Sequence, residues 1–237
     1  MTIPALSLID EIAATRARMR RDRKLGAALS GLQTWQVARL RATYADYQEI
    51  ERFRAALDFF VQDLYGPRDF RERDRDLRRV IQTWQRVLPQ RGLEAITRAL
   101  QLEALSQNLD LDVVRALASA PLTEATYADA YRSVDRRADR ARQIALIVDA
   151  GRSLDALVAR PWIPAALRAA RGPARLAGVA GLHEFLERGY AAFAKMGGAD
   201  ALLRAIERRE TAIMNNLFAG APQPFAIERE RIAPEQA

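Results

Sequence analysis

His183 has the widest chemical range of any side chain in this sequence, because it is the single histidine in the chain. An imidazole can titrate near neutral pH and can bind a haem iron as an axial ligand. One histidine excludes di-metal carboxylate centres and HExxH zinc sites, which need at least two. His183 therefore defines one candidate pocket for haem or another small molecule, which Tyr190 and Phe193 on the same predicted helix would help to line.

A structural interpretation of His183 is the one that we prefer. The residue stands near the predicted start of an apolar helix, beside Glu184 and Glu187. Histidine is often only partly buried, and at such a position it is more often a boundary residue than a ligand. No cofactor is therefore expected.

Other catalytic arrangements find little support in the sequence. The absence of cysteine excludes disulfides, thiolate metal sites and cysteine nucleophiles. There is no phosphate-binding glycine loop and no G-x-S-x-G motif. Two carboxylate pairs, Asp74 with Asp76 and Asp135 with Asp139, lie among arginines, which is typical of ion pairs on a helix surface. The balance favours a protein that is not an enzyme.

The chain is strongly basic, with a formal net charge of +7. Lysine occurs only at Lys24 and Lys195, and the many arginines are accompanied by many alanines, a pairing that coding bias in a GC-rich genome would also produce. Two runs concentrate the positive charge, Arg16–Lys24 and Arg160–Arg175, and either could bind nucleic-acid phosphates. Neither run lies in a helix-turn-helix pattern, which argues against sequence-specific recognition.

Composition indicates a folded protein that is neither exported nor membrane-spanning. Apolar residues make up 49% of the chain, enough for a substantial core. Asp10 and Glu11 follow closely behind the first apolar residues, unlike the layout of a signal peptide, and the longest apolar runs are too short to cross a bilayer. We expect a cytoplasmic protein with no transmembrane segment.

Apolar residues recur at three- and four-residue steps along most of the chain, which predicts an all-α protein. We expect a single domain of about eight helices over residues 1–220, arranged as a bundle or an irregular orthogonal array. Prolines and glycines predict a hinge at residues 160–175, where only a short helix would form. Residues 221–237 are predicted to be a loosely ordered tail.

Capping residues mark several helix ends. Thr123 is the predicted N-cap of a helix that reaches to about Val148, and Gly151 is a candidate break after it. Gly197 and Gly220 are predicted to end the last two helices.

The longest predicted helix covers residues 33–65, and at roughly 50 Å it must either run the height of a bundle or kink. Its apolar residues form a seam from Leu40 to Leu64 with helical spacing throughout. A seam this regular could pair with another chain.

The clearest helix stop and restart lies between residues 59 and 76. Gly66 can end a helix in the left-handed conformation, Pro67 prevents continuation, and Asp69 can cap the next helix. Aromatic residues on both sides predict a packed elbow between two long helices. This elbow is a candidate interaction surface and comprises Phe59, Phe60, Tyr65, Gly66, Pro67, Arg68, Asp69, Phe70, Arg73 and Asp74.

Two stretches, FFVQDLYGPRDFRERD at the elbow and GLHEFLERGYAAFAKMGGADALLRAIERRE further on, resemble an uncharacterised family of bacterial helical proteins. The resemblance covers most of the chain and supports treating residues up to Gly220 as one unit. It implies no activity, so no catalytic residue is inferred from it.

Three functions remain open. We prefer a non-catalytic interaction or scaffold protein whose elbow and seam bind a protein partner or a second copy of the chain. The first alternative is a small-molecule or haem-binding helical bundle that uses His183. The second is a nucleic-acid-binding protein that uses Arg16–Lys24 or Arg160–Arg175.

Overall fold

The computed structural model describes residues 4–61, 76 and 90–228. These ranges contain helices and no strand, which confirms the all-α prediction. The helices are α1 (Pro4–Arg21), α2 (Arg23–Thr43), α3 (Ala45–Glu49), α4 (Glu51–Asp58), α6 (Gln90–Leu117), α7 (Glu124–Val134), α8 (Arg137–Val158), α9 (Ile163–Leu176), α10 (Ala180–Met196) and α11 (Asp200–Ala219).

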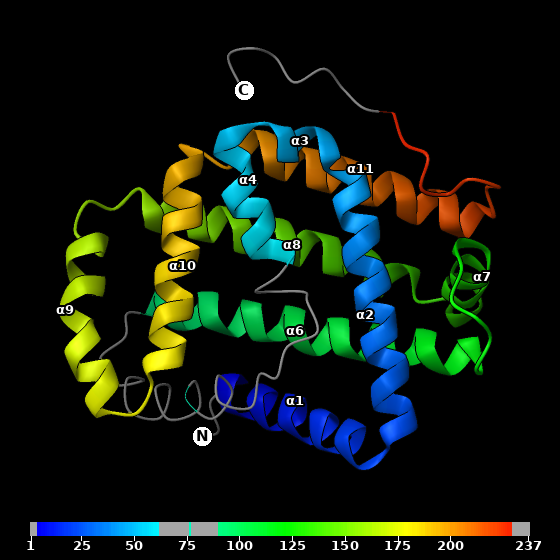
Figure 1. The fold of residues 1–237 in the computed structure, drawn as a ribbon, viewed down its shortest axis with the longest axis horizontal. Helices are drawn as coiled ribbons and strands as arrows, with labels where there is room; N and C mark the ends of the chain where they lie inside the picture. The colour runs from blue at the N-terminus through cyan, green and yellow to red at the C-terminus, as the bar shows by residue number, and fades with distance from the viewer. Residues whose placement is uncertain (1–3, 62–75, 77–89, 229–237) are drawn as a thin grey trace.

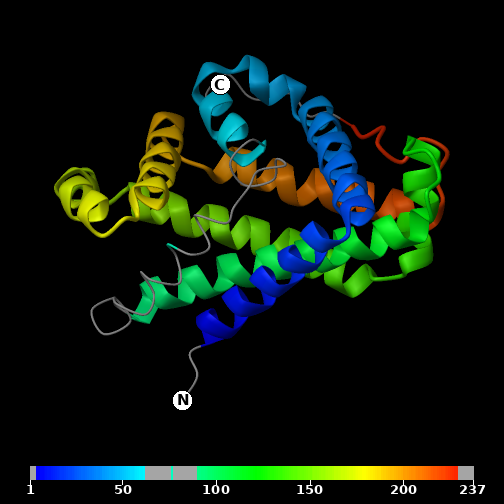
Figure 2. The ribbon, with the colours of Figure 1, turned by 60° about the horizontal axis from the view of Figure 1, so that its bottom comes forward.

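The helices form an orthogonal array rather than a parallel bundle. Figure 1 shows α1, α6, α8 and α11 stacked as rows, and neighbouring rows are in contact. Helices α2 and α10 run across these rows, with α2 packed on α6 and α10 packed on α8. In both Figure 1 and Figure 2, α9 lies at one end of the molecule, where it packs against α10.

Of the two options for the predicted helix over residues 33–65, the described part, which ends at residue 61, shows the kinked one. The chain bends at Tyr44 and again at Ile50, which separates α2, α3 and α4. The bends turn the seam inward, so that Phe53 and Leu57 join a core cluster with Leu202 of α11. The described residues of the seam are therefore buried or half-buried in this chain's own core, and Leu64 lies outside the described residues.

Two further predicted breaks fall in different places. The predicted helix from Thr123 is interrupted at Asp135, whose φ of 48° lies in the left-handed region, and α8 then continues through Gly151 to Val158. Gly151 serves packing instead, because a Cβ there would lie 2.3 Å from Leu203 Cδ2. The glycine permits the close contact between α8 and α11.

Three predicted caps are confirmed. Thr123 Oγ1 accepts a hydrogen bond from the Thr126 backbone N–H at 3.2 Å, which caps α7. Gly197 and Gly220 end α10 and α11 with φ of 67° and 69°. Local sequence therefore sets these ends, as expected for N-cap threonine and left-handed glycine.

The prediction of a broken segment at residues 160–175 was also wrong, since α9 is one helix over most of it. Pro164 lies in the first turn, where a proline costs no internal hydrogen bond. Pro173 lies inside the helix and cannot bond to the carbonyl of Ala169. Both Ala169 and Pro173 are exposed, so water can reach this side of the helix and bond to that carbonyl.

Residues 221–228 pack back onto the helices after α11. The ring of Phe225 lies 5.6 Å from that of Trp35 and 6.1 Å from that of Tyr127. The Pro224 carbonyl accepts a hydrogen bond from Asn216 Nδ2 at 3.2 Å. This part of the predicted tail is thus packed, and residues 229–237 lie outside the described ranges.

Candidate functional site

His183 lies in the first turns of α10 and is buried, with 8% of its surface exposed. Its Nε2 atom has no hydrogen-bond partner among the described residues. Glu187 Oε1 lies 3.4 Å away, close enough for electrostatic attraction but without hydrogen-bond alignment. The same oxygen accepts a hydrogen bond from Arg171 Nε of α9 at 2.7 Å. Arg171 therefore holds the carboxylate that His183 faces.

A hollow of about 150 Å³ lies beside His183, between α9 and α10. It is smaller than the pockets of roughly 300–1,000 Å³ that usually hold drug-sized ligands, and this argues against haem. Its lining residues are Arg171, Arg175, Ala180, His183, Glu184 and Glu187.

The other two residues of the predicted pocket lie elsewhere on α10. Phe193 is fully buried in the core, where its ring lies 5.7 Å from that of Phe60. Tyr190 is half-buried and is not part of the lining of the hollow. Neither Tyr190 nor Phe193 lines the hollow beside His183.

Helix α9 presents an apolar face to solvent as well as one to the core. Ile163 and Ala174 are buried against the molecule, whereas Trp162 at the N-cap and Leu176 in the last turn are 61% and 91% exposed. At about 100° per residue, positions three or four residues apart lie on the same side of a helix, and one such series connects these two exposed ends. This outward face comprises Trp162, Ala165, Ala166, Ala169, Gly172, Pro173 and Leu176, all of them exposed.

Arginines line one edge of the outward face. Arg168, Arg171 and Arg175 fall on neighbouring angular positions of α9, and Arg160 precedes the helix. No acidic residue occurs between positions 156 and 183. Within the described parts of the chain, Arg171 is paired with Glu187, whereas the side chains of Arg160, Arg168 and Arg175 have no hydrogen bond or ion pair.

The other basic run, Arg16–Lys24, forms the corner between α1 and α2. Arg16 is not available there, because its guanidinium pairs with Glu103 of α6 at 2.5 Å. Asp22 caps α2 by accepting from the Leu25 backbone N–H at 3.0 Å. Five cations at this corner are exposed and have no partner in the described ranges, namely Arg18, Arg20, Arg21, Arg23 and Lys24.

Arg209 of α11 is a buried charge that joins α11 to the bend between α2 and α3. Its guanidinium donates to the Thr43 carbonyl at 2.7 Å and to both carboxylate oxygens of Asp46. It also lies between the rings of Tyr44 and Tyr47, at 5.5 and 5.1 Å from their centroids. Burial raises the pKa of Asp46, but the hydrogen bonds and charge of Arg209 outweigh this effect and leave it below its usual value.

A second buried network connects α2, α6 and α8. Gln36 Nε2 donates to Asp110 Oδ1 at 3.1 Å. Arg140 donates to Gln143 Oε1 at 3.1 Å, and Gln143 donates in turn to Ser106 Oγ at 2.8 Å. Burial raises the pKa of Asp110 to about 6, against the opposing influence of the Arg140 charge. Asp110 is enclosed by three helices, so we assign it a structural role despite this shift.

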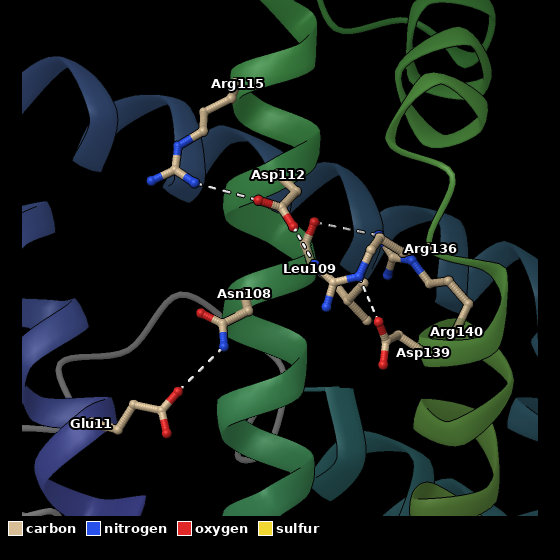
Figure 3. Close-up of polar contacts among 8 residues, drawn as sticks. All are labelled: Glu11, Asn108, Leu109, Asp112, Arg115, Arg136, Asp139 and Arg140. Carbon is tan, nitrogen blue, oxygen red and sulfur yellow. Dashed lines mark hydrogen bonds and ion pairs between the residues drawn. The ribbon is translucent and has the colours of Figure 1, made fainter.

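The edge of this network is drawn in Figure 3. Arg136 donates to Asp112 at 2.9 Å and to Asp139 at 2.5 Å, and Arg140 donates to the Leu109 carbonyl at 3.5 Å. These contacts tie the N-terminal turn of α8 to α6. Asp139 is thus engaged in a helix-surface ion pair.

No metal centre is formed by the part of the chain that the structure describes. No group of three or more histidine, cysteine, aspartate or glutamate side chains has a metal-binding arrangement there. In the same ranges, none of the helices is both long enough and apolar enough to cross a membrane.

Most of the predicted elbow lies outside the described residues, namely Tyr65, Gly66, Pro67, Arg68, Asp69, Phe70, Arg73 and Asp74. The two described members are packed. Phe59 is buried with its ring 5.3 Å from that of Phe185, and a Cβ on Gly189 would lie 2.8 Å from Phe59 Cζ. Phe59 and Phe60 therefore help to attach α4 to α10.

The outward face of α9 was not predicted from the sequence. Its residues follow helical spacing, with steps of three, one, three, three, one and three from Trp162 to Leu176. This signal is visible only if a helix is assumed through Gly172 and Pro173. The structure also joins two candidates that the sequence presented separately, because Arg171 and Arg175 of the basic run line the hollow beside His183.

Comparison with known proteins identifies a family without an activity. A family model described as a domain of unknown function (DUF8198) matches residues 15–224. Searches of curated proteins and of solved structures found no match.

Proposed function

Because this chain belongs to the DUF8198 family, whose description names no activity, we propose its function from its geometry. It is a non-catalytic interaction protein that docks a partner on the outward face of α9. The partner is a protein segment with an apolar side and acidic side chains. The observation that carries this proposal is the exposure of Trp162 and Leu176 on one side of α9, next to unpaired arginines.

Exposed apolar side chains are concentrated around this helix. The large hydrophobic residues that are exposed in the described ranges are Leu157, Trp162, Leu176 and Leu186. All four lie within residues 157–186: Leu157 in the last turn of α8, Trp162 at the N-cap and Leu176 in the last turn of α9, and Leu186 on α10, which packs against α9 at one end of the molecule (Figure 1). Clustered exposed apolar side chains mark interaction surfaces, and tryptophan and arginine dominate binding energy at such surfaces.

The arginine edge indicates the chemistry of the partner. Arg168 and Arg175 have no acidic partner within the described residues, so acidic side chains of another protein can pair with them at little internal cost. A second copy of this chain fits less well. A two-fold interface brings the same surface together from both chains. The charged residues along this face of α9 are all arginines, so they would meet no acidic side chain from a second copy.

An unbiased selection tests this proposal. A library of displayed peptides of about 16 residues, long enough to match α9, is selected against the whole protein. Enriched peptides should combine apolar and acidic residues, and their affinity should fall at least about tenfold on the double variant Trp162→Ala, Leu176→Ser. Peptides that bind this variant as tightly as the wild type would contradict the proposal.

A second pair of exposed arginines provides a matched control for the effect of charge. Arg168→Gln with Arg175→Gln should weaken the selected peptides by about tenfold, because two exposed pairs are lost. Arg20→Gln with Arg23→Gln removes the same charge at the α1–α2 corner and should change the affinity less than about twofold. Equal losses in both double variants would show only a response to net charge.

One observation supports nucleic-acid binding as a second candidate function. Five exposed cations at the α1–α2 corner, from Arg18 to Lys24, lack partners among the described residues. Binding of single- and double-stranded DNA would then fall steeply between about 50 and 200 mM salt. Arg20→Glu with Arg23→Glu should abolish it. Binding that is absent at low salt, or unchanged in this variant, would dispose of this candidate.

A further inference from the structure

One residue of the hollow between α9 and α10 has an unsatisfied hydrogen-bonding group. His183 is 8% exposed and is one of the residues that line the hollow, and its buried Nε2 atom has no hydrogen-bond partner in the described part of the chain. A buried polar atom without a partner destabilises the protein, so a ligand that supplies the partner regains a hydrogen bond that the fold leaves unmade. The neighbouring Glu187 Oε1 lies 3.4 Å from this atom, at ion-pair distance but without hydrogen-bond geometry.

A second group on the wall of the hollow is also available. Arg175 is exposed and lines the hollow, and its guanidinium has no hydrogen bond or ion pair with any described residue. An imidazole N–H and a guanidinium on one small cavity suit a ligand with two acceptor oxygens. The described residues form no metal-binding group here, so the pairing favours an anion over a cation.

The charge of the lining selects the class of anion. The two positive charges of Arg171 and Arg175 balance the two negative charges of Glu184 and Glu187. The net charge of the lining is therefore zero when His183 is neutral and +1 when His183 is protonated. A monoanion neutralises that charge, whereas a dianion would leave an excess beside two glutamates. A volume of about 150 Å³ also admits only a group of a few atoms.

We propose that this hollow is a carboxylate-binding subsite, in which His183 Nε2 and the Arg175 guanidinium each donate to one carboxylate. This inference rests on the docking function of α9 and specifies it further: an aspartate or glutamate side chain of the docked partner enters the hollow. The subsite lies beside the arginine edge of α9, since Arg171 and Arg175 belong to both.

The single histidine makes this subsite directly observable. Its imidazole proton resonances can be followed by NMR without overlap from any other histidine. The purified full chain is titrated with sodium acetate at about pH 6.5 and, in parallel, with sodium chloride at equal ionic strength. Acetate should produce a saturable shift of the His183 resonances that chloride does not produce.

Two variants separate the subsite from general charge effects. Arg175→Gln should weaken acetate binding at least about tenfold, because a charge-assisted hydrogen bond is lost. Arg160→Gln removes an equal charge outside the hollow and should weaken it less than about twofold. Both positions are exposed, so both variants should fold.

Three results would overturn the subsite: no acetate-dependent shift, equal binding in Arg175→Gln and the wild type, or saturation by sulfate at lower concentrations than acetate. The last result would indicate a site for dianions instead. Failure of the subsite is distinguishable from failure of the docking function. Peptides that require Trp162 and Leu176 would retain the docking face even if acetate does not bind.

Discussion

Arg209 on α11 and Arg175 on α9 carry the same guanidinium group in opposite environments. Arg209 is 2% exposed and bonds to Thr43 and Asp46, whereas Arg175 is exposed and has no partner in the described ranges. A buried and bonded charge fixes the relative positions of helices, and its removal leaves groups without partners. An exposed and unpaired charge contributes little to folding and is free to bind another molecule.

Apolar residues show the same contrast. Phe53 and Leu202 are fully buried where α4 packs near α11, whereas Leu176 on α9 is 91% exposed. Burial of a side chain of this size is worth roughly 1.5–3 kcal/mol. Leu176 gains almost none of this within the chain, so that energy is available for binding. The fold thus depends on the α2–α3–α11 region, and we assign binding to α9.

The largest expected effect on stability is at Arg209. Arg209→Ala should lower the free energy of unfolding by about 3 kcal/mol, because Asp46 and the Thr43 carbonyl lose their partner. Arg204→Ala on the same helix removes an exposed pair with Asp200 and should cost less than about 0.5 kcal/mol. Urea denaturation of both variants measures their unfolding free energies. A loss below about 1 kcal/mol for Arg209→Ala would contradict the claim that the buried arginine stabilises the fold.

We predict that Asp110 makes the free energy of unfolding depend on pH, by an amount of similar size. Burial raises its pKa to about 6, from the usual aspartate value of 3.8. The folded state therefore holds a proton that the unfolded state releases, and this carboxyl stabilises the fold below about pH 4 and loses that contribution as pH rises to about 6. The loss is on the order of 3 kcal/mol.

Asp110→Asn should remove this dependence. The difference in unfolding free energy between variant and wild type, measured by urea denaturation from about pH 4 to 7, should shift in favour of the variant as pH rises. The comparison cancels the opposite contribution of Asp46, whose pKa is lowered in the fold. Parallel pH profiles for the two proteins would show that Asp110 does not titrate in this range.

A smaller effect is expected where α8 meets α11. Gly151→Ala places a Cβ against the buried side chain of Leu203 and should destabilise by about 1 kcal/mol, after subtraction of the gain in helix propensity. Gly31→Ala, in the interior of α2, meets nothing within 4 Å and should stabilise by about 0.5 kcal/mol. Thermal or urea denaturation should show that Gly151→Ala lowers the stability and Gly31→Ala raises it. A change in the same direction for both variants would contradict close packing of α8 against α11.

The smallest effect on stability is expected at the outward face of α9. Trp162→Ala with Leu176→Ser should change the unfolding free energy by less than about 0.5 kcal/mol, because both side chains are exposed. Urea denaturation tests this on the same samples that are used for peptide binding. A loss above about 1.5 kcal/mol would assign the two residues to the fold and would weaken the case for docking.

The sequence predicted those features that depend on nearby residues. The cap at Thr123 and the helix ends at Gly197 and Gly220 each rest on contacts within a few positions, and all three are confirmed. The bend at Tyr44 could not be predicted in this way. Arg209, which stabilises it, is 166 positions away from Thr43 in the chain, and helical spacing is kept on both sides of the bend.

The candidate site was predicted only in part. His183 was identified because it is the single histidine, and the basic run Arg160–Arg175 was identified by its charge. Their meeting at one hollow depends on the packing of α9 against α10, which no local pattern encodes. The exposure of Leu176 is likewise a property of the tertiary arrangement.

Hydrogen–deuterium exchange of the whole protein, with and without a selected acidic peptide, tests the central claim most directly. The measurement reports binding as protection of backbone amides along the entire chain. We predict protection concentrated in residues 157–186 and no change around Arg209 or at the α1–α2 corner. Protection at residues 16–24 or 59–76, without protection of α9, would contradict the account.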